Sequence, residues 1–213
     1  TIELAPDSVT IYQMEIPYNT TIYREMKDAG KLIAPVADWQ TKRRWVKEAF
    51  AALESAGYTV GSGYTAVKEP AKSKFIYRDA LWGGADLLGL GVASFSHAAG
   101  VHYQNLTEID DYTAAIESSE MPTKRSFRTT EEQRMIREFI LRMKLGRVDA
   151  GHFDSKYGVD VLARWENELN ELTEQGLLMV EGKDIVLERD GLLCVDNILH
   201  DFFLPEHRTN KLV

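Results

Sequence analysis

The chain has 213 residues, 44% hydrophobic and 27% charged, a balance typical of a globular protein with a sizeable core. A formal net charge of −8 argues against a protein that binds phosphate backbones, and no apolar stretch reaches the roughly 18–20 residues of a membrane span. The single cysteine, Cys194, excludes an internal disulfide and any cysteine-ligated zinc or iron–sulfur site built by this chain alone.

The first third of the chain shows a strand–helix–strand pattern. Ser8–Ile16 is rich in β-branched and aromatic residues on both parities, as in a strand covered on both faces. Apolar residues at spacings of three and four predict a helix over 38–56, which Asp38 caps and Gly57 ends. A second strand is predicted at Tyr58–Val67. Because a long crossover joins parallel strands, this order predicts a right-handed α/β unit.

A glycine-rich run follows at residues 84–96 (GADLLGLGVASFS), and the segment GVHYQN occupies residues 100–105. Glycine lets a backbone approach a ligand closely, and parallel sheets bind ligands at the carboxyl ends of their strands. We therefore interpret the run as the exit of a buried strand, which forms either a ledge for a cofactor or a tightly packed turn. Its pattern is not that of a P-loop, a dinucleotide fingerprint or a nucleophile elbow.

The second half of the chain has the element order of a winged helix. Helices are predicted at residues 107–116, 129–145, 149–157, 160–175 and 189–203, with a polar connector before residue 128 and a β-hairpin at 177–187. Winged helices often bind DNA, but the helix that would enter the major groove, 160–175, carries five acidic residues against Arg164. Phosphates would repel it, so we expect a structural or docking module and no nucleic-acid partner.

Two sets of side chains are candidates for a binding site. Tyr12 and Gln13 would face the same mouth as the glycine-rich run in a parallel sheet, although Tyr12 can equally pack in the core. His97 and His102 flank that run. They lack a third ligand in reach, so we expect no metal site and interpret them as residues that line a pocket and hydrogen-bond a substrate or a carbonyl group.

A family resemblance joins these features. The sequence WGGADLLGLGVASFS at 82–96, followed by Tyr103-Gln104-Asn105, closely resembles part of the oxygen-independent coproporphyrinogen III oxidase-like radical SAM enzymes. Residues 8–20 are similar to the family's last barrel strands, and residues 129–203 resemble its accessory domain. The resemblance covers nearly all of this chain but only the C-terminal half of the family's length.

The resemblance implies an α/β fold with three parts. Residues 1–106 would be the last strands and helices of a partial (β/α) radical SAM barrel, 107–128 a helical connector, and 129–213 a winged-helix-like C-terminal domain. In this family a CxxxCxxC loop holds a [4Fe–4S] cluster that binds S-adenosylmethionine, and a deoxyadenosyl radical then abstracts a hydrogen from the substrate. The cluster ligands are absent from this chain. We therefore expect a fragment or a divided enzyme, inactive without an N-terminal cluster-binding half in cis or in trans.

The resemblance also implies which residues meet the cofactor and the substrate. Part of the S-adenosylmethionine-binding wall would be formed by Gly91, Val92, Ala93, Ser94 and Phe95. Candidate contacts to a tetrapyrrole substrate are Tyr12, Gln13, His97, Gln104 and Asn105. No residue of this chain is assigned a catalytic role. Apolar residues in the wall would keep water from the radical.

The substrate and the class of function stay open at this point. The parent would be an oxidoreductase that decarboxylates coproporphyrinogen III or performs related haem chemistry. One alternative is a haem-binding or haem-trafficking protein without turnover, in which His97 or His102 approaches the iron. Another is a noncatalytic winged-helix docking module. The single cysteine and the lack of an export signal at Thr1 indicate a cytoplasmic location.

Overall fold

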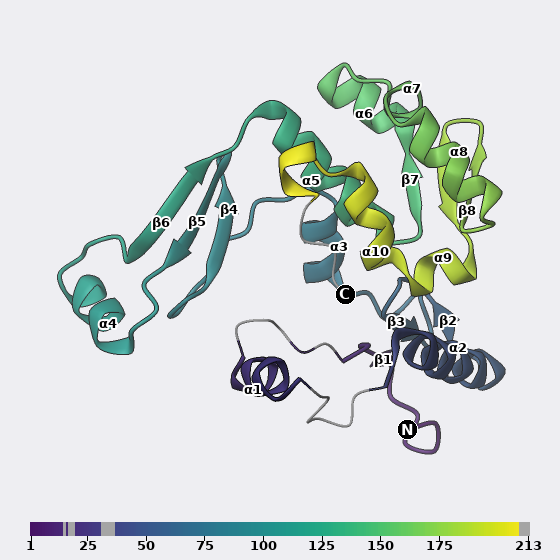
Figure 1. The fold of residues 1–213 in the computed structure, drawn as a ribbon, viewed down its shortest axis with the longest axis horizontal. Coiled ribbons are helices and arrows are strands. Elements are labelled where there is room, and N and C mark those ends of the chain that lie inside the picture. The colour runs from purple at the N-terminus through teal and green to yellow at the C-terminus, as the bar shows by residue number, and fades with distance from the viewer. Residues whose placement is uncertain (15, 17–19, 31–36, 209–213) are drawn as a thin grey trace.

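The computed structural model describes residues 1–14, 16, 20–30 and 37–208, and these form three antiparallel sheets and a set of mostly short helices (Figure 1). One sheet lies beside the long helix at Trp39–Ser55, one extends away from the rest of the molecule, and one belongs to the helical C-terminal unit, which we define as residues 129–208 (Figure 1). The fold is therefore mixed α/β. Within the described residues, no helix is long and apolar enough to cross a membrane.

The N-terminal sheet does not have the predicted parallel pairing. Its elements are β1 (Ser8–Thr10), α1 (Thr21–Ala29), α2 (Trp39–Ser55), β2 (Thr59–Val60) and β3 (Thr65–Val67). The strand order is β1-β3-β2, and both neighbours run antiparallel to β3. The predicted single strand at 58–67 is wrong because the chain turns at Gly61 to Gly63, which sends β3 back along β2. The predicted strand at 8–16 is reduced to β1, and residue 15 lies outside the described residues.

The long helix α2 follows the prediction closely. The Asp38 carboxylate accepts a hydrogen bond from the Thr41 backbone N–H at 2.7 Å, so Asp38 caps the helix as expected. Gly57, just beyond the C-terminus, has φ +88°, a backbone conformation that favours glycine. The apolar face of α2 packs with β3 in a small core, whose buried members are Val46, Phe50, Leu53, Tyr58, Ala66 and Leu193. Because Leu193 belongs to the C-terminal unit, this core joins the two ends of the chain.

The predicted buried strand at the glycine-rich run is wrong. The elements in this part are α3 (Ile76–Trp82), β4 (Phe95–Ala98), β5 (Val101–Asn105), α4 (Ile109–Glu117) and β6 (Thr123–Arg128). Residues 83–94, which we call the glycine-rich loop, precede β4 and carry only an isolated bridge from Leu87 to His97. Leu88 and Leu90 in this loop are 65% and 80% exposed. The sheet has the antiparallel order β4-β5-β6, and β6 occupies part of the predicted connector.

The C-terminal unit contains most of the predicted elements. They are α5 (Glu131–Met143), β7 (Arg147–Asp149), α6 (Ala150–Tyr157), α7 (Val161–Arg164), α8 (Glu166–Glu174), β8 (Leu178–Glu181), β9 (Asp184–Leu187), α9 (Arg189–Leu193), α10 (Val195–Ile198) and the 3₁₀ turns η1 (Leu199–Phe202) and η2 (Pro205–His207). A capping box begins α5 inside the helix predicted at 129–145, because Thr130 and Gln133 exchange side chain-to-backbone hydrogen bonds of 2.9 and 3.1 Å. The predicted hairpin is confirmed as β8 and β9.

Two predicted helices in this unit are interrupted. Trp165 separates α7 from α8 with φ −116°, and its buried ring lies 4.3 Å from the ring of Phe139. Cys194 separates α9 from α10 with φ −115°. Apolar spacing continues across both breaks, so periodicity alone could not reveal them. The centre of the core is aromatic, with Phe139 also 5.5 Å from Phe153 and 5.1 Å from Phe202 between ring centroids.

Candidate functional site

The glycine-rich loop is held in shape by polar side chains from neighbouring elements. Asn105, at the end of β5, is 4% exposed, and its Nδ2 donates to the carbonyl groups of Gly89 at 3.1 Å and Gly91 at 2.9 Å. The Ser96 hydroxyl accepts from the Gly89 N–H at 2.9 Å, and the Tyr112 hydroxyl accepts from the Gly91 N–H at 3.0 Å. A loop without regular secondary structure thereby has its backbone groups satisfied at fixed positions.

The predicted cofactor wall, Gly91–Phe95, spans the end of this loop and the first residue of β4. Gly91 and Ala93 have φ +89° and +58°, so the backbone bends sharply there. Gln104 donates to the Ala93 carbonyl at 3.2 Å, which fixes the bend to β5. Phe95 is 46% exposed and stacks on His102 with ring centroids 5.5 Å apart. The segment therefore presents backbone and apolar side chains outward.

The predicted substrate residues divide between two sheets. His97, Gln104 and Asn105 lie in β4 and β5 beside the glycine-rich loop. Tyr12 and Gln13 follow β1, in the N-terminal sheet region, so the structure does not place them at one mouth with the other three. Tyr12 is 74% exposed, which excludes the alternative that it packs in the core. Gln13 donates to the Leu193 carbonyl at 2.8 Å, an anchoring contact to α9.

Sequence reasoning missed a buried carboxylate on α5. Glu138 is 2% exposed, and both of its carboxylate oxygens are hydrogen-bonded at 2.6 to 3.0 Å to Arg142, His152, Lys156 and Tyr157. Burial raises the pKa of Glu138, but these hydrogen bonds outweigh burial and bring the pKa down to about 2. Burial and the bond to Glu138 raise the pKa of the Tyr157 hydroxyl. A lone glutamate among helix residues carries no sequence signal of such a cluster.

The Glu138 cluster also fixes the start of the glycine-rich loop. Arg142 donates to the Gly83 carbonyl at 3.0 Å. Gly84 has φ +94°, and a Cβ atom there would lie 2.6 Å from the Glu138 carboxyl group. Only glycine fits both the backbone conformation and this close approach. The loop is therefore tied to the C-terminal unit at one end and to β5 at the other.

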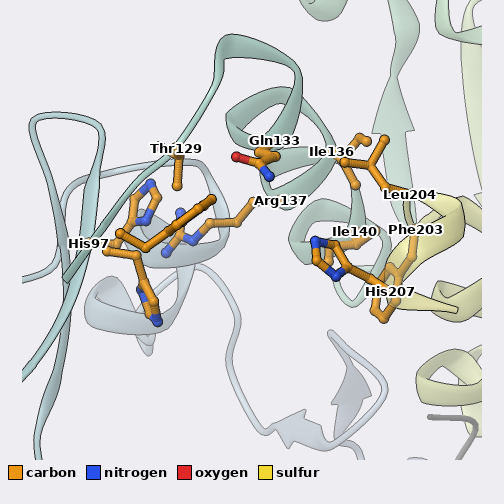
Figure 2. Close-up of a pocket in the computed structure, with 11 residues that line it drawn as sticks. His97, Thr129, Gln133, Ile136, Arg137, Ile140, Phe203, Leu204 and His207 are labelled. Carbon is orange, nitrogen blue, oxygen red and sulfur yellow. The ribbon is translucent and has the colours of Figure 1, made fainter. Parts of the chain in front are cut away.

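We call the β4-β5-β6 sheet the outer sheet. A cavity of about 360 Å³ lies between this sheet and the C-terminal unit (Figure 2). His97, Thr129 and Arg137 line one side of it, and Ile140 and Phe203 line the other (Figure 2). Arg137 is half-buried on α5. Of the two histidines, one of which was predicted to line a pocket, both His97 and His102 line this cavity, and so does Arg137, which the sequence did not single out.

The described residues do not fit an iron–sulfur cluster. They contain no group of three or more histidine, cysteine or acidic side chains that could hold a metal ion. Burial raises the pKa of the Cys194 thiol, which donates to the Asp190 carbonyl at 3.1 Å. One protonated thiol cannot replace the several thiolates that such a cluster needs.

Comparison with known proteins gives three matches. Residues 129–194 match the family described as HemN C-terminal domain. The chain is 26% identical over 132 residues to the oxygen-independent coproporphyrinogen III oxidase of Pseudomonas aeruginosa, a match that covers 58% of this chain and 28% of that protein. It superimposes on the solved structure of coproporphyrinogen III oxidase (HemN) from Escherichia coli, titled a radical SAM enzyme, with a TM-score of 0.68 and 22% identity. That alignment covers 94% of this chain and 49% of the other, so the chain spans about half the length of the solved relative.

Proposed function

We propose that this chain is part of a radical SAM oxidoreductase that acts on a tetrapyrrole. The support is its resemblance to the C-terminal part of the HemN-like family, which the comparisons confirm. The observation that carries the proposal is the glycine-rich loop, whose sequence resembles the family and whose backbone Asn105 and Ser96 hold in place. The reaction would be the oxidative decarboxylation of coproporphyrinogen III or related haem chemistry.

Residues Gly91–Phe95 would bind S-adenosylmethionine through backbone groups. The sharp bend at Gly91 and Ala93, together with the fixed carbonyl groups, supports this assignment. Val92 and Phe95 are 37% and 46% exposed and would exclude water from the bound cofactor. When bound to a cluster, S-adenosylmethionine supplies the radical that attacks the substrate. His97, Gln104 and Asn105 are proposed to lie near the substrate, and Tyr12 and Gln13 to contact it from the N-terminal sheet.

The [4Fe–4S] cluster would be held outside this chain. Cys194 is the chain's single cysteine and lies in the C-terminal unit, where its thiol donates a hydrogen bond to the Asp190 carbonyl of α9. The proposal therefore needs an N-terminal cluster-binding half, supplied in cis or in trans, and residues 1–213 alone would be inactive. Within that enzyme, residues 1–106 would complete a partial barrel, 107–128 would connect, and 129–213 would form the accessory domain. A cytoplasmic location is part of the same proposal.

The accessory domain is proposed to be a winged-helix-like module without a role in DNA binding. Its order of α5, β7, α6, α8 and the β8–β9 hairpin, with the sheet order β7-β9-β8, supports this interpretation. Exposed Glu166, Glu171 and Glu174 on α8 would repel phosphates. If the chain is instead a noncatalytic winged-helix docking module, the same acidic surface of α8 would be exposed.

A second candidate function is haem binding without turnover. His97 and His102 are paired across β4 and β5 with ring centroids 6.0 Å apart, which is the observation in its favour. Burial, followed by the charge of Arg137, lowers the pKa of His97 and keeps its ring neutral, as iron ligation requires. A Soret shift on haem titration that disappears in His97→Ala or His102→Ala would support this candidate over the first.

The main proposal is tested on a protein that contains both this chain and the N-terminal cluster-binding half. The reading frame upstream of Thr1 is read for a CxxxCxxC loop, and the protein that includes it is purified anaerobically with its cluster reconstituted. We expect that protein to form 5′-deoxyadenosine from S-adenosylmethionine and to consume coproporphyrinogen III, and we expect the 213-residue chain alone to do neither. An upstream frame without the motif, or a reconstituted cluster without S-adenosylmethionine cleavage, would contradict the proposal.

A further inference from the structure

We propose that the cavity between the β4–β6 sheet and α5 is a binding site for the carboxylate of an amphipathic organic acid, with Arg137 as the anion-binding group. The site lies beside the glycine-rich loop but is distinct from the Gly91–Phe95 wall. His97 borders both this cavity and the substrate side in the proposed function, but the inference needs neither a cluster nor S-adenosylmethionine. It stands on the side chains that line the cavity (Figure 2).

Arg137 is a cation without an ion-pair partner in the described part of the chain. The side chain is half-buried, and burial lowers the pKa of its guanidinium, although arginine stays charged at neutral pH. The charges of Asp86 and Glu138 favour the charged guanidinium, but among the described residues neither carboxylate forms an ion pair with it. Asp86 accepts from the Ala99 N–H at 3.1 Å, and Glu138 accepts from four other side chains. A partly desolvated, unpaired guanidinium at a cavity wall favours an anionic ligand.

His97 provides a second, independent indication of a ligand. Its side chain is on the cavity wall and the residue is 7% exposed, yet its Nδ1 atom is buried without a hydrogen-bond partner among the described residues. A buried polar atom without a partner is costly, and a turn of the ring toward the cavity would let it hydrogen-bond a ligand there. Burial and the charge of Arg137 lower the pKa of His97, so its neutral ring can offer one N–H donor.

The remaining walls determine the class of acid. Ile136, Ile140 and Phe203 form the apolar end, opposite His97 and Arg137 (Figure 2). An inorganic ion would leave these side chains against water, whereas an acid with an apolar body would cover them. The polar end offers the full positive charge of Arg137 with the imidazole rings of His97 and His102 beside it. One fixed charge matches a singly charged carboxylate better than a doubly charged phosphate. A guanidinium can bind the two carboxylate oxygens in a fork geometry.

The experiment uses the 213-residue chain and the fluorescent acid 1-pyrenebutyrate, with its uncharged methyl ester as a matched ligand. Fluorescence anisotropy gives Kd for each. Arg137→Met removes the charge and keeps the apolar stem, and Arg128→Met, on exposed β6, is the control with the same change in net charge. We expect saturable binding of the acid, a loss of at least about tenfold in Arg137→Met, and no change in Arg128→Met. The ester is expected to bind at least about tenfold more weakly than the acid.

With the acid, its ester and the arginine variants, four results would overturn the proposal. They are no saturable binding of the acid, equal binding of acid and ester, equal loss in both arginine variants, and displacement of the acid by inorganic phosphate at equal concentration. If Arg137→Met does not fold by circular dichroism, Ile140→Trp replaces it. Filling the apolar end should abolish binding while Arg137 remains, and unchanged binding in that variant overturns the proposal. Since no cluster is used, these outcomes are separate from failure of the proposed function.

Discussion

The C-terminal unit buries large apolar side chains around Phe139, whereas the outer sheet beside the glycine-rich loop buries the polar side chains of Ser96, His97 and Asn105. In the first region, burial of apolar surface supplies the stability. In the second, hydrogen bonds fix the backbone while Leu90 and Phe95 point outward. In such a segment the polar side chains hold the loop in shape and the apolar side chains stay exposed. Exposed apolar side chains on a fixed backbone are suited to binding a ligand or another part of a protein.

The largest expected difference between the two regions comes from shortening one phenylalanine in each. Phe139 is fully buried among three aromatic rings, so Phe139→Ala should lower the free energy of unfolding by about 3–5 kcal/mol. Phe95 is 46% exposed, and Phe95→Ala should change it by less than about 1 kcal/mol. Urea denaturation of both variants measures this. Equal losses would show that the outer sheet is stabilised like the C-terminal unit.

A nearly equal effect is expected from the buried carboxylate. Glu138→Gln leaves Arg142 and Lys156 without their anionic partner and should cost about 3 kcal/mol at pH 7. The exposed pair of Glu132 with Arg164 provides the control, since Glu132→Gln should cost less than about 1 kcal/mol. Chemical denaturation at pH 7 compares the two. A Glu138→Gln variant as stable as Glu132→Gln would contradict the electrostatic role of the cluster.

The same carboxylate gives the stability a defined pH dependence. The pKa of Glu138 is about 2 in the folded protein and lies near the ordinary 4.5 in the unfolded chain. The unfolded state therefore binds the proton first, so this contribution is full above about pH 4.5 and is lost as the pH falls toward 2. In Glu138→Gln the loss over this window should be smaller than in the wild type. Parallel stability profiles of the two proteins between pH 5 and about 2 would contradict the lowered pKa.

A smaller effect tests the tie between the two regions. Gly84→Ala places a Cβ atom 2.6 Å from the Glu138 carboxyl group at φ +94°. Gly182 has φ +64° in the β8–β9 turn with open space around it. Gly182→Ala should therefore lower the free energy of unfolding through backbone strain alone, by about 1 kcal/mol. We expect Gly84→Ala to cost about 1 kcal/mol more than Gly182→Ala in thermal or urea unfolding. Equal costs would mean that the loop is not pressed against α5.

Local signals explain what the sequence could predict. Asp38, Gly57 and the Thr130 capping box mark helix ends through contacts within a few residues, so these boundaries were found. The β8–β9 turn at Gly182 is equally local. Trp165 and Cys194 interrupt helices for reasons of tertiary packing, which apolar spacing does not encode. Signals within a few residues of one another therefore predict most of the helices and the hairpin of the C-terminal unit.

Contacts between distant residues explain what it could not predict. Whether β3 pairs in parallel or antiparallel depends on a turn at Gly61–Gly63 and on the partner strand, and strands of two or three residues carry too little pattern to decide. Glu138 and Arg137 look like ordinary polar residues of a helix in the sequence. Their roles arise only when Gly83 and His97, about forty or more residues away, fold against α5.

The most direct test of the central claim is the affinity of the cluster-reconstituted parent protein for S-adenosylmethionine. The claim is that Asn105 shapes the glycine-rich loop as a cofactor wall. Asn105→Ala should raise Kd about tenfold, because the Gly89 and Gly91 carbonyl groups lose their fixed positions. Asn170→Ala, on the exposed side of α8, should leave Kd unchanged. An Asn105→Ala protein that binds S-adenosylmethionine as tightly as Asn170→Ala would contradict the account.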